Sequence, residues 1–436
     1  MAAPKASLVL LTGSSLCHNP RVLKAASALA RAGCDVQVLG AWLEPDLKAQ
    51  DQKLIAGAPF RFVPVLDVTR PGWRAAAARQ LHRAKRKAAN VLHTVTGLES
   101  EHQFGSTTRP LMAHAQKITP DLFIAHSEPA LYVAWQLTRQ GRRVGVDMED
   151  WFSEDLLPQA RRSRPLKLLR FLEGELLKRG AYASCPSRVM SDALAAEYGC
   201  KSPAVIYNAF PWAERASVDG LRKDRRDPNA ISLCWHSQTL GPGRGLEDLA
   251  AALTLLDRGV ELHLRGRAAP GMEEWLRSRL PESWQRQVFF HPLVPHDELL
   301  SRVAEHDIGF AGEMKYCRSR DLTVTNKILH YLLGGLAVIA SDTAGQREIA
   351  AQAHGAVKLY EPGNPQALVD VLASLLGAPE RLRGTKAAAL RAAEQTFCWE
   401  RQESALIECV LAALGTQPRR LQAPDQIRES VGSNVV

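Results

Sequence analysis

The sequence contains no long hydrophobic run. Nowhere do about 18 apolar residues follow one another, the length needed for a helix that spans a membrane. The apolar segment near the start, SLVLLTG (7–13), is too short for the hydrophobic region of a signal peptide, and we expect it to form a first strand. We therefore predict a cytoplasmic protein.

Several chemical motifs are also missing. The 436 residues include eight cysteines, but none forms a CxxC pair or has zinc-ligand spacing with histidine, so we expect reduced, mostly buried thiols. No DxD motif is present to hold a divalent metal beside a diphosphate. No GxGxxG follows the first apolar run, which argues against an NAD-dependent oxidoreductase. We predict that the protein binds no metal and uses no separate cofactor.

The composition is that of an ordinary globular protein with an uneven charge distribution. Hydrophobic residues make up 46%, charged residues 23%, and the net charge is +9. The positive excess lies in residues 1–215, concentrated in two segments with helical apolar spacing, 74–93 and 161–180. Such segments form either solvated helix faces or surfaces that attract an anionic membrane or an anionic acceptor. Few aromatics accompany the first segment, and no nucleic-acid motif is present, so we predict no nucleic-acid partner.

Strand and helix patterns alternate along most of the chain. The first apolar run, a helical pattern over 19–33 and the run DVQVLGAW (35–42) form a βαβ unit. A polar, charge-rich stretch at 214–229 interrupts the alternation, which resumes with ISLCWHS (231–237). The pattern predicts an α/β protein with two doubly wound, Rossmann-like domains. Ligands of such sheets bind beyond the carboxyl ends of the strands, so the cleft between the domains is the expected site.

The segment from Asp321 to Glu348 predicts a phosphate site. Thr325 or Thr323 can cap a helix that begins near Asn326 and ends at Gly334–Gly335. The first turn of that helix carries free backbone N–H groups together with Lys327, which suits a phosphate, although a capped surface helix with a lysine is the alternative. His330 shares a face with Asn326 and either looks out beside the loop or is a partly buried structural histidine.

A glycine-rich loop at 236–249, HSQTLGPGRGLEDL, follows a predicted strand and opens a predicted helix. Gly241, Gly243 and Gly245 permit close approach of the backbone, and Arg244 adds a forked cation. Together with Lys327, this loop supplies two cations and a helix N-terminus, a combination that suits a diphosphate.

Six segments, in order, resemble the retaining glycosyltransferases of family 4 (glycosyl transferases group 1), which have the GT-B fold. They are HNPRVLKAASALARAGCDVQVL, VGVDMEDWFSEDL, LGPGRGLEDL, VPHDELLSRVAEHDIGF, NKILHYLLGGLAVIASDTAGQRE and FCWERQ. The resemblance implies an N-terminal acceptor-binding Rossmann-like domain at 1–212, a linker at 213–230 and a C-terminal nucleotide-sugar-binding Rossmann-like domain at 231–395. It also implies a helix at 396–415 that crosses back to the first domain. We expect a disordered tail at 416–436.

The resemblance assigns roles on the donor side. Arg244 matches a basic residue that contacts the donor diphosphate, and Asn326 and Lys327 match the N-K pair before the donor helix. The family places two carboxylates where this chain has Leu322 and His330. A neutral imidazole can accept one hydroxyl hydrogen bond but cannot replace a carboxylate that accepts two. We predict further donor contacts from Gly243, Thr325, Arg265 and Gly266.

The remaining candidates lie at strand ends of the first domain. His126, which with Arg244 and Lys327 forms our predicted catalytic group, resembles a position near the donor sugar; a structural loop histidine is the alternative. We predict acceptor contacts from Ser14, Ser15, Asp147 and Asp150.

The predicted function is a metal-independent glycosyltransferase of the hexosyltransferase type, acting with retention in cell-envelope or exopolysaccharide synthesis. It would use a nucleotide-diphospho-sugar and a glycan or lipid-linked acceptor, and the basic helices leave attachment to the inner face of a membrane open. A catalytically impaired pseudo-transferase and a sugar-nucleotide epimerase are the alternatives. The first is motivated by the missing carboxylates at Leu322 and His330.

Overall fold

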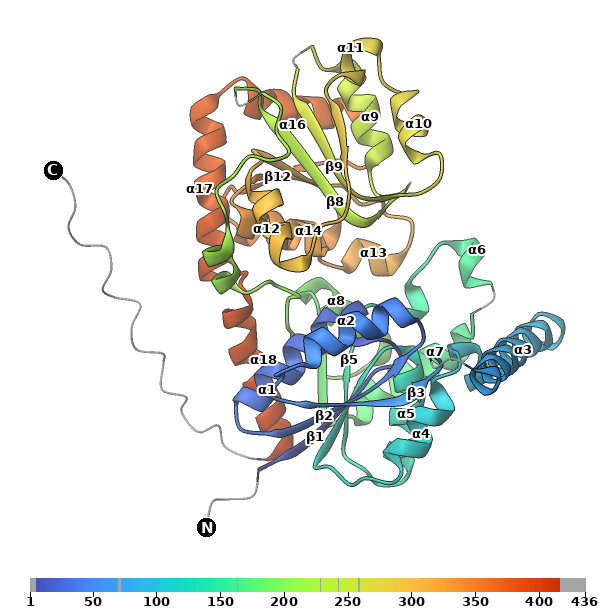
Figure 1. The fold of residues 1–436 in the computed structure, drawn as a ribbon. Coiled ribbons are helices and arrows are strands. Elements are labelled where there is room, and N and C mark those ends of the chain that lie inside the picture. The colour runs from blue at the N-terminus through green and yellow to red at the C-terminus, as the bar shows by residue number, and fades with distance from the viewer. Residues whose placement is uncertain are drawn as a thin grey trace.

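Two parallel sheets, each covered by helices on both faces, build the protein (Figure 1). The computed structural model describes residues 5–69, 72–162, 164–227, 229–241, 243–257 and 259–415. The first sheet has seven strands in the order β3-β2-β1-β4-β5-β6-β7, and the second has six in the order β10-β9-β8-β11-β12-β13. The prediction of two doubly wound α/β domains is confirmed. The predicted disordered tail at 416–436 lies outside the described residues.

The N-terminal domain holds the first sheet. Its strands are β1 (Ser7–Leu11), β2 (Asp35–Trp42), β3 (Arg61–Asp67), β4 (Leu122–His126), β5 (Val144–Asp147), β6 (Tyr182–Cys185) and β7 (Ala204–Val205). Its helices are α1 (Pro20–Arg31), α2 (Pro45–Ile55), α3 (Trp73–Thr96), α4 (Thr108–Ala115), α5 (Glu128–Arg139), α6 (Pro158–Arg161), α7 (Leu166–Arg179) and α8 (Arg188–Tyr198). The central strands β1 and β4 are almost wholly apolar because helices cover both of their faces.

The C-terminal domain holds the second sheet. Its strands are β8 (Ser232–Leu240), β9 (Glu261–Ala268), β10 (Val288–His291), β11 (Ile308–Ala311), β12 (Ala337–Ser341) and β13 (Val357–Tyr360). Its helices are α9 (Leu246–Leu255), α10 (Met272–Arg277), α11 (Glu282–Gln285), α12 (His296–Ala304), α13 (Arg318–Leu322), α14 (Asn326–Gly334), α15 (Ala344–Gln352), α16 (Pro365–Leu376) and α17 (Pro379–Gln395). None of the helices in the described part of the chain combines the length and low polarity that a bilayer crossing requires.

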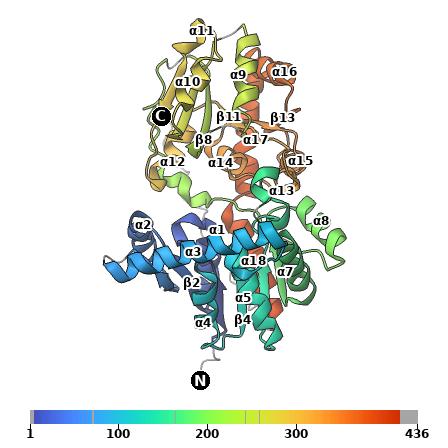
Figure 2. The same ribbon diagram turned by 90° about the vertical axis from the view of Figure 1, so that its right-hand side faces the viewer.

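The last helix, α18 (Trp399–Leu414), lies against the N-terminal domain although it follows the C-terminal domain in sequence (Figures 1 and 2). The backbone N–H of Trp399 donates to the carbonyl of Phe210 at 2.8 Å, and the Gln402 side chain accepts from the N–H of Tyr207 at 3.1 Å. Apolar side chains of α18 pack with those of β1 and α1 in one buried cluster.

The charge-rich segment between the domains is packed against the C-terminal domain. Asp224 is ion-paired with Arg265 of β9, and Arg225 lies 3.1 Å from a carboxylate oxygen of Asp307. The charged residues that led us to predict a linker here therefore also attach the segment to the C-terminal domain through ion pairs.

Tight packing against β11 fixes the position of α14. Gly309 of β11 faces the ring of Tyr331, and a Cβ atom at this glycine would lie only 2.3 Å from Cγ of that ring. Both residues lie in the interior, where the chain has no room to relax without displacing the helix.

We predict that Gly309→Ala lowers the free energy of unfolding by about 1–3 kcal/mol, because the added methyl overpacks the contact with Tyr331. Thermal and denaturant unfolding would measure the loss. Gly384→Ala in α17 is the matched control, since a Cβ there meets no atom within 4 Å. Alanine should stabilise that helix by about 0.5–1 kcal/mol. A Gly309→Ala variant as stable as the wild type would contradict the packing argument.

Candidate active site

A cavity of about 560 Å³ lies between the two domains, at the carboxyl ends of their central strands. The N-terminal domain lines it with His18, Asn19, Pro20, Arg21, Glu149, Asp150, Pro186 and Asn208. The C-terminal domain lines it with His236, Ser237, Gln238, Thr239, Arg244, Arg265, Leu293, Val294, Leu299, Glu313, Arg320, Thr323, Val324, Thr325, Asn326 and Lys327. Charged and amide side chains thus gather where an α/β fold places its ligands.

The N-terminus of α14 opens into this cavity with its backbone N–H groups uncapped. Thr325 occupies the cap position with an extended backbone, but its side chain makes no capping hydrogen bond. The hydroxyl of Thr323 instead donates to the carbonyl of Ser319 at 2.7 Å. The prediction that Thr323 or Thr325 caps the helix was wrong. The consequence strengthens the site, because uncapped N–H groups at the positive end of a helix favour an anion.

Lys327, in the first turn of α14, is buried and paired. Its ammonium lies 2.9 Å from Oε1 of Glu313 and sits over the ring of Trp235, 5.3 Å from the centroid. Burial lowers the pKa of Lys327, the charges of Arg244 and Arg320 act in the same direction, and Glu313 opposes them. Part of the lysine charge is therefore already balanced by a carboxylate.

Arg244 lies in the glycine loop, on the same C-terminal side of the cavity as α14. Its guanidinium donates to Oγ of Ser237 at 3.0 Å and makes no ion pair with any described residue. Gly245 has φ +76°, and a Cβ there would lie 2.8 Å from the Cα of Gly312, so only glycine permits this close approach. The loop thereby presents an arginine whose charge is available to a bound anion.

The structure brings six of the predicted site residues together at the cavity: Asp150, Arg244, Arg265, Thr325, Asn326 and Lys327. Arg265 lies there with its charge engaged, since it is ion-paired with Asp224 and also donates to the carbonyl of Pro292 at 2.6 Å. Gly243 and Gly266 belong to the neighbouring loop and strand but are not among the described residues that line the cavity.

His330 does not face the cavity, contrary to one of the two predictions for it. Its side chain is buried, packs against the tilted ring of Phe210 at 4.5 Å between centroids and bonds through Nδ1 to Nε2 of His236 at 3.2 Å. Burial lowers the pKa of His330 to about 3 and that of His236 well below its usual value. Both rings are therefore neutral near pH 7, and His236 is the one that lines the cavity.

His126 and Asp147 lie one layer behind the cavity wall. Asp147 is ion-paired with Arg21 at 2.8 Å, and His126 bonds through Nδ1 to Glu149 at 2.9 Å. Burial opposes ionisation of Asp147, but the Arg21 charge outweighs it and holds the pKa below the usual value. Arg21 and Glu149 line the cavity, whereas His126 and Asp147 do not, so the latter pair positions the side chains that do.

The two serines after β1 are also set back from the cavity. The hydroxyl of Ser15 is buried and donates to the carbonyl of Ala41 at 3.1 Å, and that of Ser14 faces the carbonyl of Ser15 at 3.4 Å. The Ser15 hydroxyl thus ties the loop that joins β1 to α1 to strand β2, and the Ser14 hydroxyl is used within the loop itself. Their predicted acceptor contacts would require this loop to rearrange.

Several cavity residues were missed from the sequence, chiefly Glu149, Glu313 and Arg320. Glu313 follows β11 and Glu149 follows β5 by two residues each, so the rule that ligands meet the carboxyl ends of strands would have identified them. Arg320 lies on the short helix α13, which the sequence pattern did not separate from the loop.

We predict that the Lys327–Glu313 pair is strongly coupled. Glu313→Gln alone leaves a buried ammonium without its carboxylate, which should cost about 3–5 kcal/mol of stability. Lys327→Met alone should also destabilise, and the double variant should be less destabilised than the sum of the two. A double-mutant cycle from denaturant unfolding measures this coupling. The exposed pair Arg383–Glu380, 65% and 86% exposed, is the control and should show coupling near zero. Additive effects at Lys327 and Glu313 would contradict the prediction.

A second prediction concerns Asp150, whose pKa burial raises to about 7, against the opposing charge of Arg320. In the unfolded chain an aspartate has a pKa near 3.9. Between about pH 4 and pH 7 the Asp150 carboxyl is therefore protonated in the folded protein and ionised in the unfolded chain. The stability contributed by Asp150 is full below about pH 4 and is lost as the pH rises through about 7. The free energy of unfolding of Asp150→Asn, which cannot ionise, should therefore rise by about 2–4 kcal/mol relative to that of the wild type between pH 4 and pH 8. A difference that stays constant across this range in urea titrations would refute the proton assignment.

The fold of the chain is shared with solved structures of low sequence identity. No protein family description matches the sequence, and no curated protein matches it. Among solved structures, Anabaena HepE in complex with UDP has a TM-score of 0.65 at 16% identity, covering 93% of this chain and 100% of that one. Sucrose-phosphate synthase from Thermosynechococcus elongatus has a TM-score of 0.68 at 15% identity, covering 94% and 100%. The α,α-trehalose-phosphate synthase (UDP-forming) of Burkholderia vietnamiensis has a TM-score of 0.63 at 14% identity, covering 94% and 100%. The chain has the GT-B fold: two Rossmann-like domains that face each other across a cleft.

Proposed function

We propose that the protein is a glycosyltransferase that takes a sugar from a nucleotide-diphospho-sugar. One observation carries the proposal: the uncapped N-terminus of α14 and Arg244, which has no ion pair among the described residues, meet at the interdomain cavity. Backbone N–H groups and a forked guanidinium suit the two phosphates of such a donor. HepE in complex with UDP, which has the same fold, supports a uridine nucleotide as the first candidate.

The charge arrangement fits departure of a diphosphate. As the bond between the sugar and the distal phosphate lengthens, the sugar gains oxocarbenium character and the diphosphate gains negative charge. Arg244 and the first turn of α14 stabilise that charge, and donors of this kind contribute roughly 2.7–4 kcal/mol each in comparable oxyanion sites. Lys327, held by Glu313, adds a fixed but partly balanced positive charge on the same side.

The N-terminal wall of the cavity suits an acceptor hydroxyl. Glu149 accepts a hydrogen bond from Asn19 at 3.1 Å, and Asp150 lies beside it with a raised pKa. We assign to Asp150 the contact with an acceptor or sugar hydroxyl. For transfer with retention, the acceptor attacks the face from which the diphosphate leaves, and the departing phosphate takes the hydroxyl proton. This proton route requires no strong base in the N-terminal domain.

The sequence-based expectations complete the proposal. The donor diphosphate is neutralised by protein groups without a metal, and the acceptor is a glycan or lipid-linked glycan of cell-envelope or exopolysaccharide synthesis. The ribose contacts that a carboxylate at position 330 makes in family 4 must come from elsewhere, because His330 is buried. His236 bonds to His330 and lines the cavity, so its neutral imidazole is the candidate for such a contact.

A screen of nucleoside diphosphates by thermal shift and calorimetry tests the proposal. We expect one of them to stabilise the protein, by about 2.7 kcal/mol at a concentration 100-fold above its dissociation constant. Arg244→Ala should weaken binding about 10- to 100-fold, the effect of a lost charge-assisted hydrogen bond. Arg391→Ala, an exposed arginine of α17, is the control and should bind as the wild type. If no nucleoside diphosphate binds, or Arg244→Ala binds equally well, the proposed donor site is wrong.

Turnover separates the transferase from its two alternatives. A transferase releases nucleoside diphosphate at an appreciable rate only when an acceptor is added. An epimerase converts the sugar nucleotide with no acceptor, and a pseudo-transferase binds the nucleotide without turnover.

A further inference from the structure

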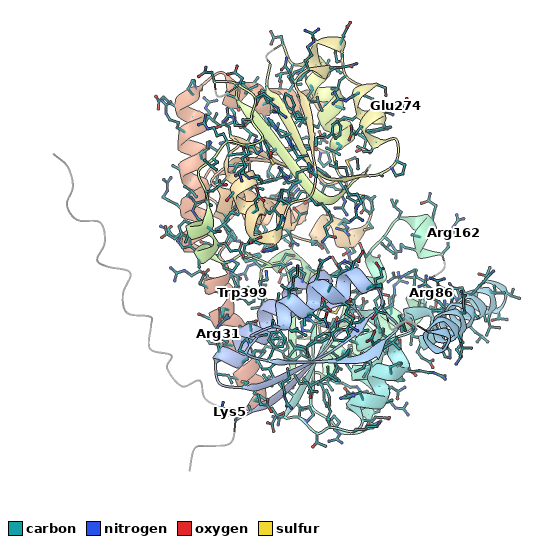
Figure 3. All side chains as sticks on the ribbon, in the orientation of Figure 1. Lys5, Arg31, Arg86, Arg162, Glu274 and Trp399 are labelled. Carbon is teal, nitrogen blue, oxygen red and sulfur yellow. The ribbon has the colours of Figure 1, made fainter. Side chains whose placement is uncertain are left out.

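Helix α3 stands at the edge of the N-terminal domain with most of its surface exposed. Figure 1 shows it projecting from the domain beside α7, Figure 2 shows it lying across the front, and Figure 3 places Arg86 on it at the periphery. It contacts the turn formed by Glu101–Phe104, while its described side chains are exposed or half-buried. In most proteins a helix is stabilised by packing its apolar face against the core. This 24-residue helix makes few such contacts, so its apolar side chains are free to contact another surface.

The outer side of α3 is apolar. Leu81, Ala84, Ala88, Val91 and Val95 follow one another at spacings of three and four residues and so form one stripe along the helix. All five are exposed, Val95 by 77%, and Leu92 at the border of the stripe is 50% exposed. The stripe faces solvent rather than the core of the domain, the reverse of an ordinary surface helix.

The opposite side of α3 is basic and lines a cavity of about 640 Å³ against the body of the domain. Arg83, Arg86, Lys87 and Asn90 come from the helix, and the body contributes Leu43, Glu44, Val68 and Ser106. The three cations make no ion pair with any described residue, and Glu44 is the one carboxylate in the described lining. The cavity therefore carries a net positive charge and space for an anion.

We propose that α3 docks the protein on an anionic lipid bilayer, with its apolar stripe in the interfacial layer and lipid phosphates in the basic cavity behind it. A helix with one apolar and one cationic side lies in the plane of such an interface. The stripe enters to the depth of the upper acyl chains, and Arg83, Arg86 and Lys87 then stand at the level of the phosphates. Lys85, beside the stripe, can extend its ammonium to the same level.

Other anionic partners fit less well. A nucleic acid would gain nothing from an outward aliphatic stripe, and residues 74–96 of α3 include no phenylalanine, tyrosine or tryptophan for base stacking. An acidic protein could use the cations, but the stripe is a single exposed line on a convex helix and not a groove that would receive a partner helix. The proposal does not depend on the identity of the sugar donor.

Sedimentation of the full-length protein with vesicles tests the proposal. We expect binding to phosphatidylglycerol vesicles, little binding to phosphatidylcholine vesicles, and weakening by salt. Arg83→Gln and Arg86→Gln should each reduce the partition coefficient about fivefold, the effect of one basic residue near an anionic surface. Leu92→Gln should reduce it about tenfold, the effect of withholding one leucine from the apolar layer.

Two variants outside α3 provide matched controls. Leu255→Gln changes a leucine of α9 that is 56% exposed, close to the 50% of Leu92, and Arg391→Gln removes an exposed cation of α17. Both should partition as the wild type. Equal binding to the two vesicle types, or α3 variants that bind like the controls, would overturn the proposal. Competition by an acidic protein but not by vesicles would assign the surface to a protein partner instead. Binding of nucleoside diphosphates by the same variants should be unchanged, so failure here is distinguishable from failure of the donor site.

Discussion

Glu348 of the C-terminal domain caps helix α8 of the N-terminal domain and so ties together the two domains that form the walls of the cavity. Its carboxylate accepts the backbone N–H groups of Arg188 and Val189 at 2.9 and 3.0 Å, and it also bonds to the hydroxyl of Tyr207. A carboxylate at a helix N-terminus is favoured by both the free N–H groups and the helix dipole. Ser187 donates to the carbonyl of Leu322 at 2.6 Å nearby. These bonds hold Asp150 and Arg244 on opposite walls of one cavity.

The sequence predicted the architecture well, since buried parallel strands are nearly continuous apolar runs. DVQVLGAW forms β2 with the predicted bounds, and α14 begins at Asn326 and ends before a left-handed Gly335, as expected. The strands β3 and β13 were missed because Arg61–Asp67 and Val357–Tyr360 are half-buried or short and mix polar with apolar residues. Edge strands of this kind lack the pattern that marks a central strand.

Site residues could be predicted from the sequence only where the backbone alone, a helix start or a glycine loop, places them at the cavity. Lys327, Asn326 and Arg244 follow directly from a helix start and a glycine loop. His330, His126 and Asp147 were placed on the correct elements, but their orientation depends on partners far away in the sequence, such as His236, Glu149 and Arg21. Helical spacing cannot show which of two neighbouring layers a side chain occupies. Glu313 was missed although it follows the end of β11, and its pairing with Lys327, 14 residues later, is visible only in the structure.

The crossing of α18 has a consequence for biosynthesis. Trp399, Leu406, Ile407 and Val410 are buried with Leu8 and Val22 in one cluster, so the first layer of the N-terminal domain is completed by nearly the last described residues. During translation the N-terminal strands and helices emerge long before this cover is available. The part of this cluster that α18 covers stays exposed until the whole second domain has been made, and exposed apolar surface of this kind favours aggregation of the nascent first domain.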